Sequence, residues 1–251
     1  MAQQSGGGVQ SVERVFDLLE IIAGQGGTAT LSELATESEL PLPTIHRLLR
    51  TLLSKGYVRQ LANRKYALGP RLIRLGDAAG RQLGANAKHE LHELVKNMEE
   101  TANMAVLDGD YVLYVAQAPS PHAMRMFTEV GQRVHPHASG VGKAMLSTLD
   151  DDAVRAIVGR TGMPTPTKQS LGTVEELLAD LSLTRERGYA IDEGEQELGV
   201  RCIAVPLPNA PTPSAISISG PNTRVTEELT VQAVPLLQAA AARIVASIED
   251  S

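Results

Sequence analysis

The sequence predicts an α+β protein: an N-terminal winged helix-turn-helix, a linker helix, and a C-terminal domain with a mainly antiparallel sheet. Three features predict this arrangement. Residues 30–68 contain two helix patterns and a basic hairpin, residues 71–84 have a helical pattern, and residues 103–219 mix strand and helix patterns. The 251 residues are 43% hydrophobic, which is enough to fill the cores of two domains.

A helix-turn-helix is indicated between Thr30 and Gly56. Thr30 and Glu33 form a capping-box pattern, which marks the start of one helix. Pro41 and Pro43 suit the first turn of the next helix, where no backbone donor is needed. In that second helix the apolar residues recur on one face, and Gly56 ends it. These apolar residues are Leu42, Ile45, Leu48, Leu49, Leu52 and Leu53.

A basic hairpin follows, with strand patterns at residues 57–60 and 65–68 around a turn at Asn63-Arg64-Lys65. The segment from Pro41 to Leu75 carries a charge of +8 without any acidic residue, whereas the whole chain carries −6 and the remainder therefore −14. A charged helix face is often merely solvated, but this asymmetry on a helix-turn-helix is typical of a DNA-binding surface. We therefore expect double-stranded DNA as a partner.

The polar face of the second helix and the hairpin tip supply the expected contacts. Hydroxyl and guanidinium groups can meet base edges or phosphates, and sequence alone does not divide the residues between these roles. For His46, packing on the helix flank is an alternative to DNA contact. The predicted DNA-binding residues are Thr44, His46, Arg47, Arg50, Arg64 and Lys65.

Composition shifts predict the domain boundaries. Residues 1–8 are polar and glycine-rich and are predicted to be a disordered tail. The DNA-binding domain is expected at residues 9–70, with a first helix at 11–23, and a second domain at residues 85–251. The linker helix at residues 71–84 has an apolar set that could pack against a second subunit, namely Leu72, Ile73, Leu75 and Leu83.

The second domain is predicted to combine helices with strands. Asp108-Gly109-Asp110 suits a hairpin turn between two of the strands. Strands are predicted at residues 103–107, 111–118, 123–130, 189–192, 201–207 and 214–219. Helices are predicted at residues 85–101, 144–149, 151–160, 173–187 and 225–248.

Cysteine usage and hydropathy favour a cytoplasmic protein. A single cysteine excludes an internal disulfide and fits a reducing compartment. The N-terminal residues lack the features of a signal peptide, and no apolar run is expected to reach the length of a membrane span.

Five short runs, taken in order, carry a family resemblance: Val9-Gln10-Ser11-Val12-Glu13-Arg14, Leu42-Pro43-Thr44-Ile45-His46-Arg47-Leu48-Leu49, Tyr66-Ala67-Leu68-Gly69, His137-Ala138-Ser139-Gly140-Val141-Gly142-Lys143-Ala144 and Arg187-Gly188-Tyr189-Ala190. With them the chain resembles the IclR family of bacterial transcriptional regulators over essentially its whole length. The resemblance implies a winged helix joined by a linker helix to a GAF-like effector domain. It also implies dimers or tetramers, and a small, often carboxylate-bearing metabolite that changes operator binding.

The C-terminal half most resembles the glyoxylate-responsive repressors of allantoin utilisation. The similar runs are Met124-Arg125-Met126, His137-Ala138-Ser139-Gly140, Gly199-Val200-Arg201-Cys202-Ile203-Ala204, Ala215-Ile216-Ser217-Ile218-Ser219-Gly220-Pro221 and Thr226-Glu227. This resemblance implies a repressor whose effector is a small organic acid such as glyoxylate; an activator responding to another organic or aromatic acid is the alternative. Val141 stands where these repressors tend to have alanine. The implied effector-binding residues are Ser139, Gly140, Val141, Asp192, Cys202, Ser217, Ile218 and Ser219.

The residue types allow this role and also simpler ones. Backbone amides after Ser139 could converge on an anion, or Ser139 could be a plain helix cap. Ser217 and Ser219 lie on one face of a strand, which is either a pocket wall or a solvent face. Asp192 would repel an anionic ligand unless it bonds a hydroxyl, holds a hydrated aldehyde or is itself protonated. Cys202 is either an inert buried thiol or, as a hypothesis, forms a reversible adduct with an aldehyde.

Two other classes of function use the same residues. An enzyme could pair Cys202 with His135 or His137 as nucleophile and base, but no local signature supports this pairing. A zinc-dependent sensor could use His135, His137, Asp192 and Cys202, although a structured turn explains the His-Pro-His run as well. We expect a regulator that is not an enzyme and has no metal or other cofactor.

Overall fold

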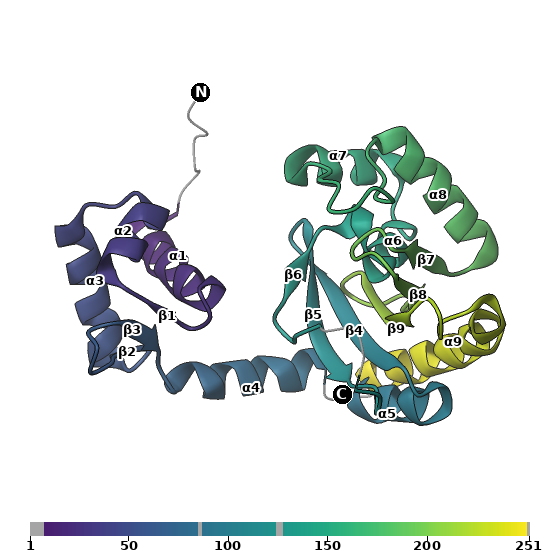
Figure 1. Cartoon of the computed structure of the whole chain (residues 1–251), viewed down its shortest axis with the longest axis horizontal. Coiled ribbons are helices and arrows are strands. Elements are labelled where there is room, and N and C mark those ends of the chain that lie inside the picture. The colour runs from purple at the N-terminus through teal and green to yellow at the C-terminus, as the bar shows by residue number, and fades with distance from the viewer. Residues whose placement is uncertain (1–7, 85–86, 124–127, 250–251) are drawn as a thin grey trace. The chain divides into compact units, whose positions relative to one another are not determined.

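The computed structural model describes residues 8–84, 87–123 and 128–249. Its internal contacts divide the chain into two compact units, residues 1–79 and residues 80–251 (Figure 1). Each unit has its own hydrophobic core, as expected of a separate domain. Of the predicted disordered tail, all but Gly8 lies outside the described residues.

The first unit packs three helices against a small antiparallel sheet in the strand order β1-β3-β2. Its helices are α1 (Gln10–Gly24), α2 (Leu31–Ser38) and α3 (Leu42–Lys55), and its strands are β1 (Thr28–Ala29), β2 (Val58–Gln60) and β3 (Tyr66–Leu68). The core brings one side of each helix together, including Leu18, Ile22, Leu34, Ile45 and Leu49. This is a winged helix-turn-helix, as the sequence predicts; the two-residue strand β1 was not predicted.

Local chemistry sets the ends of α2 and α3. At the start of α2, Glu33 N donates to Thr30 Oγ1 at 3.2 Å and Thr30 N donates to Glu33 Oε2 at 2.6 Å, so the predicted capping box is confirmed. Pro43 lies in the first turn of α3, as predicted, whereas Pro41 is the N-cap residue just before it. Gly56 ends α3 with a φ of 76°, a left-handed conformation that glycine adopts without a Cβ penalty.

Helix α4 (Arg71–Gly84) lies where the sequence predicts a linker helix. Of its apolar residues, Ile73 and Leu75 are exposed and Leu72 is half-buried. The side chain of Leu83 lies outside the described residues. Ile73 and Leu75 therefore belong to the predicted subunit-packing set and are exposed in the single chain.

The second unit is built on a six-stranded, fully antiparallel sheet in the order β6-β5-β4-β9-β8-β7. Its strands are β4 (Thr101–Asp108), β5 (Tyr111–Ala118), β6 (Arg133–Val134), β7 (Ala190–Glu193), β8 (Val200–Pro206) and β9 (Ser214–Pro221). Strands β4 and β5 form the predicted hairpin, with Gly109 in the turn at a φ of 61°. The strands nearest the centre of the sheet, β4 and β9, are almost wholly buried.

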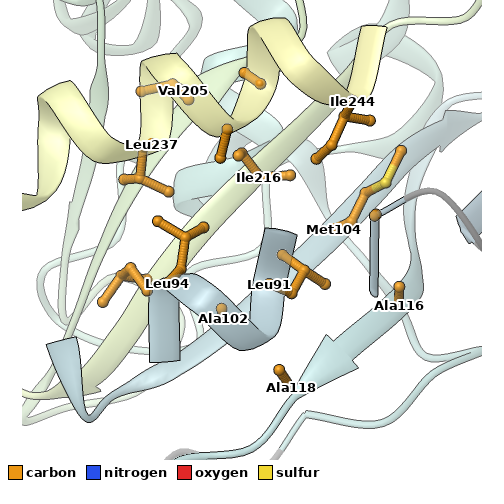
Figure 2. Close-up of a cluster of buried hydrophobic side chains, with 14 of the residues drawn as sticks. Leu91, Leu94, Ala102, Met104, Ala116, Ala118, Val205, Ile216, Leu237 and Ile244 are labelled. Carbon is orange, nitrogen blue, oxygen red and sulfur yellow. The ribbon is translucent and has the colours of Figure 1, made fainter. Parts of the chain in front are cut away.

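Helices cover both faces of this sheet (Figure 1). On one face lie α5 (Ala87–Met98) and α9 (Glu227–Glu249), which pack Leu91, Leu94, Leu237 and Ile244 against alternate strand residues such as Ile216 (Figure 2). On the other face lies the short helix α6 (Gly140–Leu146), preceded by the 3-10 helix η1 (Pro136–Ala138). Helices α7 (Asp151–Thr161) and α8 (Val174–Arg187) pack on α6 through Leu146, which completes a third layer.

Two predicted elements are wrong in part. The strand predicted at residues 123–130 is absent from those of its residues that the structure describes; residues 124–127 lie outside them, and the sixth strand is β6 instead. The helix predicted at residues 85–101 ends at Met98, because Glu99 has a positive φ and Thr101 already pairs with Ser219 in the sheet. Long-range pairing therefore overrides local helix preference here.

The expectation that no helix reaches the length of a membrane span is also wrong. Within α9, Glu227–Ile248 is 22 residues long with a mean hydropathy of 1.5, so by length and composition alone it could cross a membrane; it is the one such helix in the described part of the chain. One side of α9, including Ala233, Leu237, Ala240 and Ile244, packs into the core against the sheet. Core packing accounts for the apolar residues on this side of α9, whereas Val231 and Leu236 are exposed.

Candidate DNA interface and ligand site

The predicted DNA-binding residues lie on α3 and on the β2–β3 hairpin. His46, Arg47 and Arg50 are exposed on α3, on the side opposite the buried Ile45 and Leu48. Exposure of His46 counts against its packing on the helix flank. Thr44 is half-buried in the first turn of α3. The polar side of α3 is therefore free to contact another molecule.

The hairpin tip presents the remaining two basic residues. Arg64 has a φ of 65°, and Lys65 N donates to Asn63 Oδ1 at 3.1 Å, so the asparagine side chain shapes the turn. Arg64 is exposed and Lys65 is half-buried. Both lie at the tip of the wing, next to the start of β3.

A groove of about 400 Å³ runs along α3 beside the wing. His46, Arg47 and Arg50 line it together with Pro43 and the wing residue Tyr66, and Leu49 and Leu53 form its apolar part. A groove with three polar or basic side chains on one wall has the chemistry that phosphate and base-edge contacts need.

In the second unit, the predicted ligand residues gather between α6 and the sheet. Strand pairing places Asp192 opposite Cys202 and Cys202 opposite Ser219, so these three side chains form one row across β7, β8 and β9. In the neighbouring row, Ala204 pairs with Ser217 and Ser217 with Asn103. Directly paired residues point to the same face of a sheet, and Ala204 packs on the α6 side.

The start of α6 lies directly against this row. A Cβ added to Gly140 would meet Cys202 Sγ at 2.8 Å, and one added to Gly142 would meet Pro136 O at 2.2 Å. Only glycine permits this close approach. Ser139 caps α6 by accepting a hydrogen bond from Gly142 N at 3.3 Å. Ser139 therefore caps α6 and also lies at the helix start beside the row of Asp192, Cys202 and Ser219.

Two predicted ligand residues are placed differently from the rest. The side chain of Ile218 points to the opposite face of β9 and is buried in the core beneath α5 and α9. Val141, fully buried, packs with Ala105, Val112 and Met145 in the small core beneath α6.

Ser217 is the most informative member of the set. Its side chain is fully buried, yet its Oγ has no hydrogen bond of normal geometry in the described part of the chain. It lies close enough to the Cys202 thiol to lower the pKa of that group. A buried hydroxyl without a proper hydrogen-bond partner lowers the stability of the fold by about 1–3 kcal/mol. We therefore expect a further polar group to bind at Ser217.

Asp192 is buried at the end of the row. Burial raises its pKa to about 7, and the charge of Glu195 adds to this, while a hydrogen bond from Glu195 N at 2.6 Å and the charge of Lys143 oppose it. The carboxyl is therefore about half protonated at neutral pH. This removes much of the repulsion that an ionised Asp192 would exert on an anion.

Cys202 has the character of an inert thiol. Burial, together with the charge of Asp192, raises its pKa to about 12, so it stays protonated at neutral pH. Since the thiolate is the nucleophilic form, both the proposed pairing with His135 or His137 and the aldehyde adduct are disfavoured. His137 Nε2 donates to Pro164 O at 2.9 Å, and burial lowers the pKa of its ring.

Several polar residues of this site were missed in the sequence. Asn103 and Gln117 stand next to Ser217 and Ser219 on β4 and β5, and Tyr114 lies near Cys202 and Asp192, which with burial raise its pKa. The signal was available, because an asparagine and a glutamine interrupt two apolar strands. Lys143, 1% exposed, is held by Glu195 at 2.5 Å and Asp180 at 3.1 Å.

A metal centre has no support in the described residues, which contain no group of three or more His, Cys, Asp or Glu side chains placed to share an ion. The four residues considered for zinc do not form such a group. The site is polar and buried, and its donors suit a small organic molecule rather than a metal.

Comparisons with known proteins agree with this arrangement. A family model described as the IclR helix-turn-helix domain matches residues 11–62, and one described as the C-terminal domain of the bacterial transcriptional regulator IclR matches residues 78–246. The solved structure of an IclR transcriptional regulator from Alicyclobacillus acidocaldarius is similar with a TM-score of 0.86 and 29% identity, over 96% of this chain and 99% of that one.

Two curated relatives are repressors. The transcriptional repressor IclR of Escherichia coli (strain K12) is 38% identical over 229 residues, which cover 88% of this chain and 84% of that protein. The transcriptional repressor AllR of Salmonella paratyphi A is 32% identical over 226 residues, which cover 88% of this chain and 83% of that protein.

The fold and these matches define a helix-turn-helix DNA-binding regulator, and not an enzyme. The chain belongs to the IclR family of bacterial transcriptional regulators. The resemblance inferred from its short motifs is thereby confirmed. Identity to the AllR repressor is lower than to the IclR repressor, so overall similarity does not single out the allantoin type.

Proposed function

We propose that the chain is a repressor whose operator binding is changed by a small carboxylate such as glyoxylate. The observation that carries the ligand proposal is the buried Ser217 hydroxyl, which has no proper partner and stands in a row of polar side chains under α6. The half-protonated Asp192 and the absence of a reactive thiol favour reversible, non-covalent binding. Repression is supported by the curated names of the relatives.

The proposed division of labour follows the predicted boundaries. Residues 9–70 hold DNA through Thr44, His46, Arg47, Arg50, Arg64 and Lys65, and residues 85–251 hold the effector. A ligand changes operator affinity only if it binds the DNA-competent and incompetent states differently. Helix α4, which we propose as the linker at residues 71–84, joins the two domains and would carry this coupling in a cytoplasmic dimer or tetramer.

Calorimetric titration of the full-length protein with glyoxylate tests the ligand proposal. Ser217→Ala should weaken binding roughly tenfold, because it removes one buried hydrogen bond to the ligand. Ser214→Ala is the matched control on the same strand, since Ser214 Oγ donates to Thr212 O at 2.8 Å, away from the row. Equal affinity of the wild type and Ser217→Ala would contradict the proposed site.

A further inference from the structure

A buried chain of side-chain hydrogen bonds ends at Ser219, beyond the residues that the family resemblance implies. Its members are Thr128, Gln117, Asn103 and Ser219, which come from four separate segments of the second unit. Asn103, Ser219 and Thr128 are each at most 5% exposed. Such a chain in a low-dielectric interior has one favourable set of donor and acceptor directions, and these can be derived step by step.

The backbone carbonyl of Thr128 fixes the first direction, because a carbonyl can only accept. It receives a hydrogen bond from Gln117 at 2.7 Å, so the Gln117 amide must turn its nitrogen toward it. The same nitrogen, Nε2, lies 3.1 Å from Asn103 Oδ1 and also contacts Thr128 Oγ1. Its second proton is therefore available to Asn103.

Asn103 is fixed in turn. Its Oδ1 accepts from Gln117 Nε2 and from Thr128 Oγ1 at 2.8 Å, which uses both lone pairs. A reversed Asn103 amide would place its NH₂ group against the Gln117 NH₂ group, donor against donor. The Asn103 nitrogen must therefore face the other way, where it donates to Ser219 Oγ at 3.1 Å.

Ser219 is left with a proton to give. Its Oγ accepts from Asn103 and donates no hydrogen bond within the described part of the chain. The neighbouring Ser217 hydroxyl on the same strand face also lacks a proper partner. Two buried hydroxyls on one face of β9 therefore each carry a proton that no acceptor in the described part of the chain receives.

The geometry points to Asn103 as a positioning residue that makes Ser219 a hydrogen-bond donor to the effector. This inference rests on the proposed effector site and names the ligand chemistry at one end of it. The group held at Ser219 is an acceptor, such as a carboxylate or oxo oxygen, and not a donor such as an ammonium group. Gln117 and Thr128 act one step further back by holding Asn103.

Glyoxylate titration of full-length variants tests the inference. In Asn103→Asp at pH 8, the carboxylate accepts the Ser219 proton instead of donating to Ser219, and affinity should fall at least about tenfold. Asn222→Asp is the matched control, since it adds the same charge at an exposed position of the same domain. Equal losses in Asn103→Asp and Asn222→Asp would overturn the role of Asn103.

A double-mutant cycle separates positioning from simple charge repulsion. If Asn103 acts through Ser219, then Asn103→Asp in a Ser219→Ala background should cost less than about threefold, because the hydroxyl it redirects is gone. The same loss in both backgrounds would show that the new charge acts directly on the ligand, which overturns the inference.

A measurement without ligand keeps the inference testable if a variant fails to fold or glyoxylate does not bind. In the ¹H–¹⁵N spectrum of the wild-type protein, the Asn103 side-chain amide signals should shift in Ser219→Ala, because the acceptor is removed. Unchanged signals would contradict the chain of hydrogen bonds. Absence of glyoxylate binding with shifted signals would instead overturn the proposed effector alone.

Discussion

At the residue scale, burial gives ordinary side chains the properties on which the proposed ligand site depends. In water, Asp192 and Cys202 would have ordinary pKa values, and the Ser217 hydroxyl would bond to solvent. Packed under α6, the carboxyl is about half protonated, the thiol stays neutral and the hydroxyl lacks a proper partner. These properties come from the low dielectric and from pairing across the sheet, and each has a measurable consequence.

Asp192 should make stability depend on pH. The unfolded chain loses the Asp192 proton near pH 4, whereas the folded chain keeps it up to about pH 7, so rising pH favours the unfolded state over this window. Asp192→Asn removes this pH dependence. The free energy of unfolding of the variant, relative to that of the wild type, should therefore rise by up to about 4 kcal/mol between pH 4 and 7. Urea unfolding at several pH values measures this, and a constant difference across the window would contradict the raised pKa.

Cys202 should resist alkylation. Cys202 is 4% exposed and the pKa of its thiol is raised to about 12, so little thiolate is available at pH 8. Mass spectrometry after iodoacetamide treatment should show unmodified Cys202 in the native protein. In about 8 M urea, which unfolds the protein, Cys202 should be completely modified. Rapid modification of the native protein would instead revive a chemical role for the thiol.

At the element scale, the local signals in the sequence specified the helices and strands well. Apolar periodicity and capping residues located α1, α2, α3, α7 and α8, and the Asp108-Gly109-Asp110 turn located the β4–β5 hairpin. The failures occur where distant pairing decides the outcome. Residues 99–101 are not helical because Thr101 pairs with β9. The strand that pairs with β5 at the edge of the sheet is β6, and the local pattern of residues 123–130 does not indicate this.

The ligand site shows the same limit. Ser217 and Ser219 were assigned to one face from alternation alone, and their shared face is confirmed because Ile216 and Ile218 are buried in the opposite core. Their neighbours Asn103 and Gln117 could not be paired with them, because strand order and register are set by contacts more than a hundred residues apart.

Helix α3 should carry operator recognition. Arg47→Ala removes an exposed guanidinium from the groove beside the wing and should weaken operator binding by about 1–3 kcal/mol, roughly 5- to 150-fold. Lys168→Ala is the control, since it removes an exposed charge of the same sign from the other unit. Operator binding by Arg47→Ala that equals the Lys168→Ala control would remove Arg47 from the interface, whereas effector affinity should be unchanged in both variants.

The cap of α2 should contribute to stability of the first unit. Thr30→Ala breaks the capping box and should lower the free energy of unfolding by about 1 kcal/mol. Thr36→Ala makes the same substitution in the exposed interior of α2, where alanine favours the helix, and should cost nothing. Thermal unfolding of both variants measures the difference, and equal midpoints would contradict the role of the cap.

At the scale of the whole molecule, charge and burial divide the work between the two units. The basic segment from Pro41 to Leu75 lies largely in the winged helix, whereas the remaining chain is strongly acidic. The acidic unit buries the proposed effector residues beneath α6. An effector bound there must act through a change of conformation, with α4 as the connection between the units.

We propose above all that a small carboxylate changes the affinity of this regulator for its operator. A gel-shift titration of the full-length protein on its own upstream intergenic DNA, with glyoxylate and with acetate as the control acid, tests this claim most directly. We predict a specific complex that glyoxylate releases and acetate leaves intact. A specific complex that is indifferent to glyoxylate would contradict the claim for this effector, and the absence of any specific complex would contradict the operator assignment.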